Sequence, residues 1–310
     1  RSPWPGVQGP WRSSMSREAY VRGVIEIRER VARGLVYQAN LCRLLTAELG
    51  GVGHSGGDAS SGGESTGRHG RATTDDERAA RDDAGSGRPI DDGDAFSPLA
   101  LARVLAAGNP ARYQGVLHTG AEWIVSASPE LFLSRDGDRL LSAPIKGTAA
   151  PGEPFAAKDT PENIMICDLV RNDLGRVALT GTVRVESLLA REELPGLAHL
   201  VSTVSAQLRP GAGWHEVFTA LLPPGSVSGA PKHTALGTIR DLEPVPRGPY
   251  CGAIGYVDGD RRRAELAVGI RTFFTTGGMR RLHFGTGAGI TALSDPEAEW
   301  AETELKAARL

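Results

Sequence analysis

Two pairs of acidic residues have the spacing of about one helical turn. Asp159 and Glu162 lie three residues apart, and so do Glu299 and Glu302. At this spacing both side chains of a pair leave the same face of a helix. Two such faces brought together offer the oxygen ligands that Mg²⁺ prefers. Acids in a first helical turn also complement the helix macrodipole and are usually solvated, so the spacing alone leaves both interpretations open.

Two glycine-rich segments, residues 225–232 and 285–289, indicate places where the backbone can bind an anion. Glycine lets the chain approach a ligand closely and expose its N–H groups. Neither segment has the pattern of a P-loop or a dinucleotide-binding fingerprint. Arg271 falls in an apolar run that we interpret as a strand over residues 264–274. A guanidinium there is either paired with a core acid or held for a carboxylate ligand.

Lys146 and Glu130 form a third group of candidates. A lysine between Ile145 and Gly147 is commonly a surface residue on a loop. If it is desolvated or placed near other cations, its pKa falls and the neutral amine becomes a nucleophile. Glu130, at the start of a predicted strand, is either a general acid or a surface charge. These patterns alone predict an anionic ligand and allow for a metal ion.

Hydrophobic periodicity predicts the elements that position these residues. Helical spacing predicts helices over residues 16–33, 99–106 and 158–174, and the capping-box spacing of Ser294 and Glu297 predicts another over residues 294–310. Strand patterns cover residues 35–49, 113–117, 122–126, 131–134, 139–141, 183–188, 200–207, 251–257, 264–274 and 280–284. Strands interspersed with helices, without a regular βαβ alternation, indicate an α+β fold class.

We expect one folded domain over residues 16–310, preceded by a flexible N-terminal extension over residues 1–15. Residues 50–93 interrupt this domain, because Val52 and Ile90 are their only large aliphatic residues. Such a segment buries too little apolar surface to offset its ordering entropy. We therefore predict a disordered low-complexity insertion there.

Composition excludes several classes of partner. The formal net charge of −2 provides no electrostatic footprint for nucleic acid or an anionic membrane surface. The longest apolar runs are too short to span a bilayer. Cys42, Cys167 and Cys251 are far apart and form no C-x-x-C pair, so neither a disulfide framework nor a zinc site is indicated. These features fit a reducing, cytoplasmic compartment.

Together the motifs resemble the chorismate-utilising enzymes, which include anthranilate synthase large subunits, aminodeoxychorismate synthases, and isochorismate and salicylate synthases. The resemblance covers nearly everything after residue 16 except the insertion. It lies in an ordered series of segments: residues 37–41 (YQANL), 128–132 (SPELF), 144–148 (PIKGT), 158–176, 197–202, 225–232, 247–256, 270–272, 285–289 and 294–306. Such a series is far more specific than any single motif.

The resemblance implies the anthranilate synthase component I-like fold, an α/β sandwich of two antiparallel sheets with the active site in a cleft between them. The chorismate-binding catalytic domain is then residues 16–310, with a shortened N-terminal subdomain. The positions that match the family's Mg²⁺ ligands are Glu162, Glu299, Glu302 and Asp159, the last standing where the family usually has Glu. The metal in turn holds the ring carboxylate of chorismate.

The resemblance also assigns residues to the substrate pocket. Tyr250, Arg271 and the backbone of Gly285, Thr286 and Gly287 match positions that bind the enolpyruvyl carboxylate. His199, as a catalytic residue, and Ser226 and Thr148, as substrate-binding residues, are expected in the same pocket.

Two positions discriminate among the reactions of the family. Isochorismate and salicylate synthases resemble one another in a lysine base that activates water, where this chain has Gln38. Anthranilate synthases are similar at Gln38 but typically carry alanine where this chain has Lys146, and aminodeoxychorismate synthases carry lysine. The resemblance therefore implies an aminodeoxychorismate synthase in which Lys146 is the covalent nucleophile and Glu130 an acid/base partner. The alternatives are an anthranilate synthase large subunit and a non-catalytic paralogue that binds chorismate.

The chain departs from the family in two places. Ala149 and Ala150 follow the lysine motif where relatives often have an arginine, and the segment before residue 16 is short, so tryptophan feedback is not expected. No Cys–His–Glu amidotransferase region is visible in the sequence. We therefore expect a separate glutamine amidotransferase subunit to supply ammonia.

Overall fold

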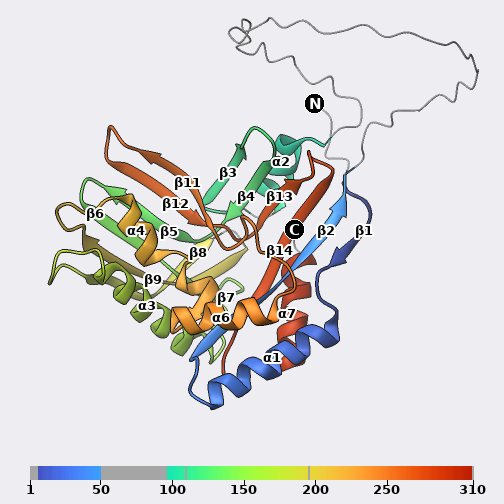
Figure 1. Cartoon of the computed structure of the whole chain (residues 1–310), viewed down its shortest axis with the longest axis horizontal. Coiled ribbons are helices and arrows are strands. Elements are labelled where there is room, and N and C mark those ends of the chain that lie inside the picture. The colour runs from blue at the N-terminus through green and yellow to red at the C-terminus, as the bar shows by residue number, and fades with distance from the viewer. Residues whose placement is uncertain (1–5, 50–95, 109, 195, 309–310) are drawn as a thin grey trace, which may run out of the picture.

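The strands form two antiparallel sheets in a computed structural model that describes residues 6–49, 96–108, 110–194 and 196–308 (Figure 1). Sheet A has the order β1-β2-β14-β13-β4-β3, with β10 also paired to β2; its strands are β1 (Gln8–Ser13), β2 (Gln38–Glu48), β3 (Tyr113–His118), β4 (Trp123–Ser128), β10 (Gly229–Ala230), β13 (Thr272–Thr276) and β14 (Arg281–Ile290). Sheet B has the order β11-β12-β5-β6-β9-β7, with β8 also paired to β9; its strands are β5 (Leu131–Asp136), β6 (Arg139–Ala143), β7 (Ile145–Ala149), β8 (Arg184–Leu194), β9 (Leu197–Gln207), β11 (Ala253–Asp258) and β12 (Arg263–Val268). The predicted α+β class with two antiparallel sheets is confirmed.

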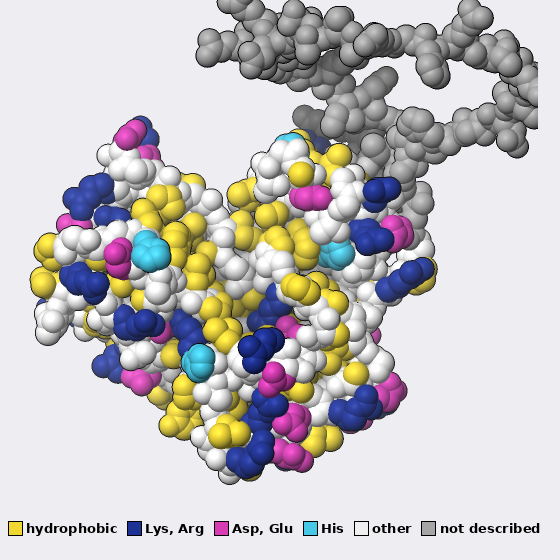
Figure 2. Space-filling view, in the orientation of Figure 1, with side chains coloured by type: hydrophobic (Ala, Val, Ile, Leu, Met, Phe, Trp, Pro, Cys, Tyr) yellow, Lys and Arg dark blue, Asp and Glu magenta, His cyan; other side chains and the backbone are white. Residues whose placement is uncertain are grey.

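Helices cover both sheets. They are α1 (Arg17–Ala32), α2 (Pro98–Gly108), α3 (Asp159–Gly175), α4 (Trp214–Leu221), α5 (Gly225–Ser228), α6 (Lys232–Leu242) and α7 (Pro296–Ala308). The helix α3 packs on β7, β8 and β9 of sheet B, whereas α1 and α7 pack on each other and on sheet A. Figure 2 shows a notch between the two halves of the molecule, with hydrophobic side chains along its walls. Among the described residues, no helix is long and apolar enough to cross a membrane.

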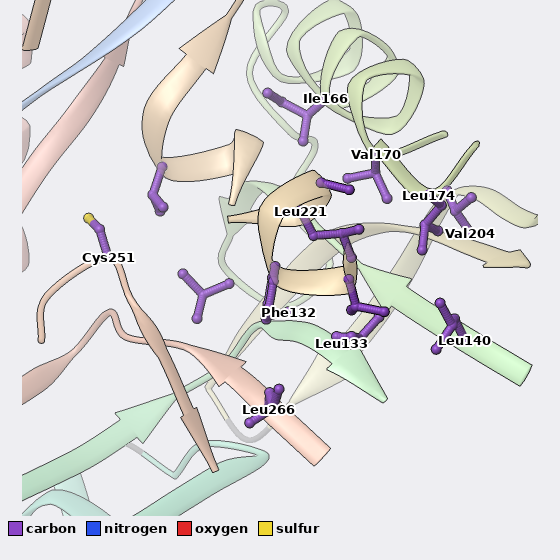
Figure 3. Packing of buried hydrophobic residues seen from close by; sticks show 14 of the residues in the cluster. Phe132, Leu133, Leu140, Ile166, Val170, Leu174, Val204, Leu221, Cys251 and Leu266 are labelled. Atoms are coloured by element: carbon purple, nitrogen blue, oxygen red, sulfur yellow. The ribbon is translucent and has the colours of Figure 1, made fainter. Parts of the chain in front are cut away.

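The core of the sheet B half is built on one stripe of α3. Ile166, Val170 and Leu174 are spaced four residues apart and are buried. They belong to one cluster with Leu140 and Val204 of the sheet beneath (Figure 3). This is the spacing at which side chains share a helix face. The packing fixes α3 against sheet B, and with it the acidic residues at the N-terminal end of the helix.

The prediction of a single strand over residues 264–274 is wrong. The chain leaves sheet B at the end of β12 and enters sheet A at β13. Between them, Gly269 exchanges backbone hydrogen bonds with Cys251 (2.8 Å) and Gly252 (2.7 Å) instead of continuing the ladder. Arg271 has φ of +49° and so lies in the crossover, not in a strand. Both flanking strands are largely buried, so their apolar residues join into one run in the sequence.

The prediction of a flexible extension over residues 1–15 is wrong for its described part. Residues Gln8–Ser13 form the edge strand β1, which pairs with β2 through Arg12↔Thr46 and other partners. The segment contains glycine and proline and lacks a clear alternating pattern, so its sequence carries little strand signal. The predicted insertion over residues 50–93 lies outside the described residues.

Arg43 holds α7 in place on sheet A. Its side chain is buried, donates from Nε to Thr303 Oγ1 at 3.1 Å, and forms an ion pair with Glu304. Its guanidinium also lies 4.2 Å from the centre of the Trp300 ring. Trp300, Thr303 and Glu304 are positions i, i+3 and i+4 of α7, so they lie on one face of the helix. Arg43 therefore restricts the rotation of α7, which carries Glu299 and its neighbouring acids.

Replacing Arg43 with Met is expected to lower the free energy of unfolding by about 1–3 kcal/mol, because a buried hydrogen bond and a cation–π contact are lost. The control is Arg17→Met, which removes an exposed ion pair between Arg17 of α1 and Glu297 of α7. That change is expected to cost less than about 1 kcal/mol. Urea denaturation measures both effects, and equal losses would contradict the role given to Arg43.

Candidate active site

Lys146 lies on β7 where this strand pairs irregularly with β9. The next residue, Gly147, has φ of +94°, a conformation that favours glycine. A Cβ at Gly147 would lie 3.0 Å from the side chain of Asp159. Glycine thus lets the first turn of α3 approach the strand that carries the lysine.

Ser226 connects the lysine with Glu130. The ammonium Nζ of Lys146 donates to the backbone carbonyl of Ser226 at 3.0 Å. The buried carboxyl group of Glu130 accepts hydrogen bonds from the side chain of Ser226 and the backbone N–H of Ile145. Asn40 donates its side-chain amide to the same Ser226 carbonyl at 3.3 Å. One residue of α5 therefore contacts both candidate catalytic groups.

Burial shifts both candidates toward their neutral forms. It raises the pKa of Glu130 to about 7, although the hydrogen bond from Ser226 and the charge of Lys146 oppose the shift. Burial also lowers the pKa of Lys146, against the opposing charges of Glu162 and Glu130. A carboxyl group that can still donate a proton near neutral pH thus lies beside an amine that loses one more readily than usual.

A small cavity borders Glu130. Its volume is about 20 Å³, which is room for about one water molecule, and Glu130 and Ser226 are among its lining residues. Asp173, which forms an ion pair with Lys232 at 2.8 Å, lines it as well. The cavity therefore lies next to the carboxyl group whose pKa burial raises.

His199 is buried on β9, beside the lysine strand. Its Nδ1 lies 3.1 Å from Thr148 Oγ1. Burial lowers the pKa of His199 to about 4, and the positive charge of Arg271 contributes, while a backbone hydrogen bond at Gly147 opposes the shift. The imidazole is therefore neutral at pH 7 and can donate or accept a hydrogen bond. The structure thus brings His199, Thr148 and Arg271 together near Lys146.

The ring of Tyr250 packs against the backbone of β14 at Gly285. A Cβ at Gly285 would lie 2.2 Å from the ring of Tyr250, so this ring packs directly on the strand backbone. Thr286 faces the other side, where its hydroxyl donates to the carbonyl of Thr303 at 3.0 Å. Any contribution of Thr286 to ligand binding therefore comes from its backbone, as does that of Gly287.

Three of the four predicted metal ligands gather around Lys158. Its Nζ lies 3.4 Å from Glu299 Oε1 and 3.5 Å from Glu302 Oε2. Burial raises the pKa of Glu162, against the charges of Lys146 and Lys158, and the charge of Glu299 raises it further. Glu162 Oε1 and Glu299 Oε2 are buried without a hydrogen-bond partner. Buried carboxylate oxygens that lack donors are suited to a hard cation.

Asp159 differs from the other three acids. Its Oδ2 accepts a hydrogen bond from the backbone N–H of Ala156 at 3.0 Å, so one oxygen is already engaged. Among the described residues, no group of three or more Asp, Glu, His or Cys side chains has a geometry that could hold a metal ion. The two unpartnered oxygens of Glu162 and Glu299 are thus the observation that fits a cation, and Asp159 fits it least.

The sequence interpretation missed two lysines of this site, Lys158 and Lys306. Lys306 donates to the carbonyl of Gly287 at 2.8 Å and forms an ion pair with Glu302 at 2.8 Å. Burial alone would raise the pKa of Glu302, but Lys306 and Lys158 outweigh it and lower this pKa. The spacing of four residues between Glu302 and Lys306 was the available signal, since such a pair shares a helix face.

Comparison with known proteins gives consistent results. The family model described as chorismate binding enzyme matches residues 90–310. Anthranilate synthase component 1 of Thermus thermophilus is 42% identical over 225 residues, which cover 69% of this chain and 48% of that protein. Aminodeoxychorismate synthase of Streptomyces griseus is 41% identical over 228 residues, which cover 69% of this chain and 31% of that protein.

A solved structure extends the similarity to the fold. The crystal structure of anthranilate synthase component I from Streptococcus pneumoniae superposes with a TM-score of 0.73 at 27% identity, covering 97% of this chain and 59% of the other. The chain spans about half, or less, of the length of these curated relatives. From its fold, its site and these matches, the chain belongs to the chorismate-binding enzymes.

Proposed function

We propose that this chain is the synthase component of an aminodeoxychorismate synthase, which converts chorismate and ammonia to 4-amino-4-deoxychorismate. The observation that carries the proposal is the environment of Lys146, whose Nζ lies 3.0 Å from the Ser226 carbonyl and close to the buried Glu130. A desolvated amine with a lowered pKa is suited to nucleophilic attack. The relative named aminodeoxychorismate synthase supports this assignment.

In the first step, the neutral Nζ of Lys146 forms a bond to C2 of the ring. The two conjugated double bonds shift toward C4, and the C4–O bond breaks. Glu130 donates its proton to the departing hydroxyl, which leaves as water. The raised pKa of Glu130 supports this role, because the group keeps its proton near neutral pH.

In the second step, ammonia forms a bond to C4 and the double bonds shift back. The C2–N bond breaks, and Lys146 leaves as the neutral amine. The surplus proton on the new amino group passes to the Glu130 carboxylate, which restores the starting state of the site. Ammonia is proposed to come from a glutamine amidotransferase subunit, in keeping with the name component 1 of the relatives.

The remaining residues bind and orient the substrate. We assign Arg271, Tyr250 and the backbone of residues 285–287 to the enolpyruvyl carboxylate, and Thr148 and the neutral His199 to hydrogen bonding at the ring. Glu162, Glu299 and Glu302 would hold Mg²⁺, and Asp159 is at most an additional ligand through water. When bound, Mg²⁺ would neutralise the ring carboxylate of chorismate.

An anthranilate synthase component is the second candidate, because several relatives of about 40% identity carry that name. The buried Gln38 agrees with either amination reaction. Its amide donates to Asn40 Oδ1 at 3.3 Å and cannot serve as a base toward water. Lys146 is therefore the residue that favours the first candidate over the second.

Lys146→Ala is expected to abolish amination at C4, because the covalent intermediate cannot form. The variant and the parent are incubated with chorismate, Mg²⁺ and ammonium, and their products are resolved by mass spectrometry. Formation of 4-amino-4-deoxychorismate by the parent supports the proposal, whereas anthranilate supports the second candidate and unchanged chorismate a binding-only paralogue. Retention of C4 amination by Lys146→Ala would refute the nucleophile assignment.

The rate should fall on the acid side as Lys146, which acts as the neutral amine, takes up a proton, and on the alkaline side as Glu130, which acts in its protonated form with a pKa raised to about 7, loses its proton. Glu130→Gln should lose the descending limb on the alkaline side and react about 100- to 10,000-fold more slowly. Initial rates between pH 5 and pH 9 at saturating ammonia measure both. A descending limb that persists unchanged in Glu130→Gln would exclude Glu130 as the acid.

Glu299→Gln should weaken Mg²⁺ binding by roughly tenfold or more, which corresponds to about 1.4 kcal/mol, because one charged ligand is lost. Isothermal titration calorimetry with Mg²⁺ alone measures the affinity. Glu297→Gln, at an exposed position on the same helix, is the matched control. Equal affinities for all three proteins would place the cation elsewhere.

A further inference from the structure

The strand that carries Lys146 contains a β-bulge opposite β9. Ile145 pairs with Val201 and Thr148 with His199, so Lys146 and Gly147 together face the single residue between these partners. Bulges re-aim side chains, but they leave backbone groups without ladder partners. A bulge beside a catalytic lysine therefore needs another source of hydrogen bonds.

Asn163 of α3 supplies these hydrogen bonds. It is 1% exposed, and its Nδ2 donates to the carbonyl of Leu200 on β9 at 2.8 Å and to the carbonyl of Lys146 on β7 at 3.5 Å. A side-chain amide has two N–H donors, which is the number these two carbonyls require. Asn163 thus bridges both strands at the bulge.

A second residue fixes which way the amide faces. The hydroxyl of Ser202 donates to Asn163 Oδ1, which leaves Nδ2 directed at the two carbonyls. Ser202 Oγ in turn accepts from the backbone N–H of Leu189 at 3.1 Å. Leu189 has φ of +57° and lies in an irregular stretch of β8, on the other side of β9. The irregular stretches of β7 and β8 are therefore linked through Ser202 and Asn163.

From this arrangement we infer that Asn163, oriented by Ser202, is a positioning residue that holds the β7 bulge in the conformation that directs the Lys146 amine to Ser226 and Glu130. The inference rests on the proposed function for the role of Lys146, whereas the bulge and its hydrogen bonds stand independently of it. Asn163→Leu keeps the approximate volume and adds no charge, but it removes both donors. The carbonyls of Lys146 and Leu200 then lose their partners and the bulge relaxes.

The test combines hydrogen–deuterium exchange with steady-state kinetics. Asn163→Leu should raise amide exchange locally over residues 145–149 and lower kcat roughly 100-fold, the size of effect expected from a small misplacement of a reacting group. KM for chorismate should stay unchanged, because the lysine acts after binding. Ser202→Ala, a milder change, should act in the same direction and serves if Asn163→Leu does not fold. Thr203→Ala, whose side chain leaves the opposite face of β9, is the matched control.

Three results would overturn the inference: parental exchange at residues 145–149, exchange raised equally throughout sheet B, or a rise in KM with kcat unchanged. Exchange is measured without substrate, so it decides the role of Asn163 even if Lys146→Ala retains C4 amination. In that case the proposed function fails, while the positioning of the bulge is still confirmed or refuted.

Discussion

Placing an amine and a carboxyl group side by side in a desolvated pocket is the constraint on which the rest of the site depends. Burial penalises the charged form of each, and their mutual attraction restores only part of what solvation would supply. Ser226 offsets the remaining cost, since its carbonyl accepts from Lys146 and its side chain donates to Glu130. The loop that bears Ser226 must therefore be positioned as accurately as the two titratable groups themselves.

The architecture meets this requirement by drawing on both sheets. The short strand β10 follows Ser226 after two residues and pairs with β2 of sheet A, while Lys146 lies on β7 of sheet B and Glu130 immediately precedes β5 of that sheet. The crossover at Arg271 links the two sheets next to His199. The two candidate catalytic groups are thus held from the side of sheet B, and the strand that follows Ser226 is held by sheet A.

Local patterns were sufficient to predict the two helices that carry the acidic pairs. The apolar spacing of residues 158–174 indicated α3, the capping-box spacing of Ser294 and Glu297 indicated α7, and Lys146 lies in a segment that resembles a family motif. The strand break at Gly269 was not predictable in this way, because its backbone partners at Cys251 and Gly252 belong to a separate segment. Asn163 was missed for the same reason, since its role depends on carbonyl groups of two strands that no sequence pattern reveals.

The long pairing between β2 and β14 has a consequence for how the protein is made. These strands come from opposite ends of the described chain, yet they are adjacent along their full length at the centre of sheet A. Contacts of such large sequence separation form slowly. The conformational entropy of the intervening chain must be lost before these contacts can stabilise the fold. On the ribosome, sheet B can assemble while sheet A still lacks β14 and the α7 acids. Until β14 and α7 have been synthesised, sheet A therefore lacks the strand that pairs with β2 and the helix that carries Glu299 and Glu302.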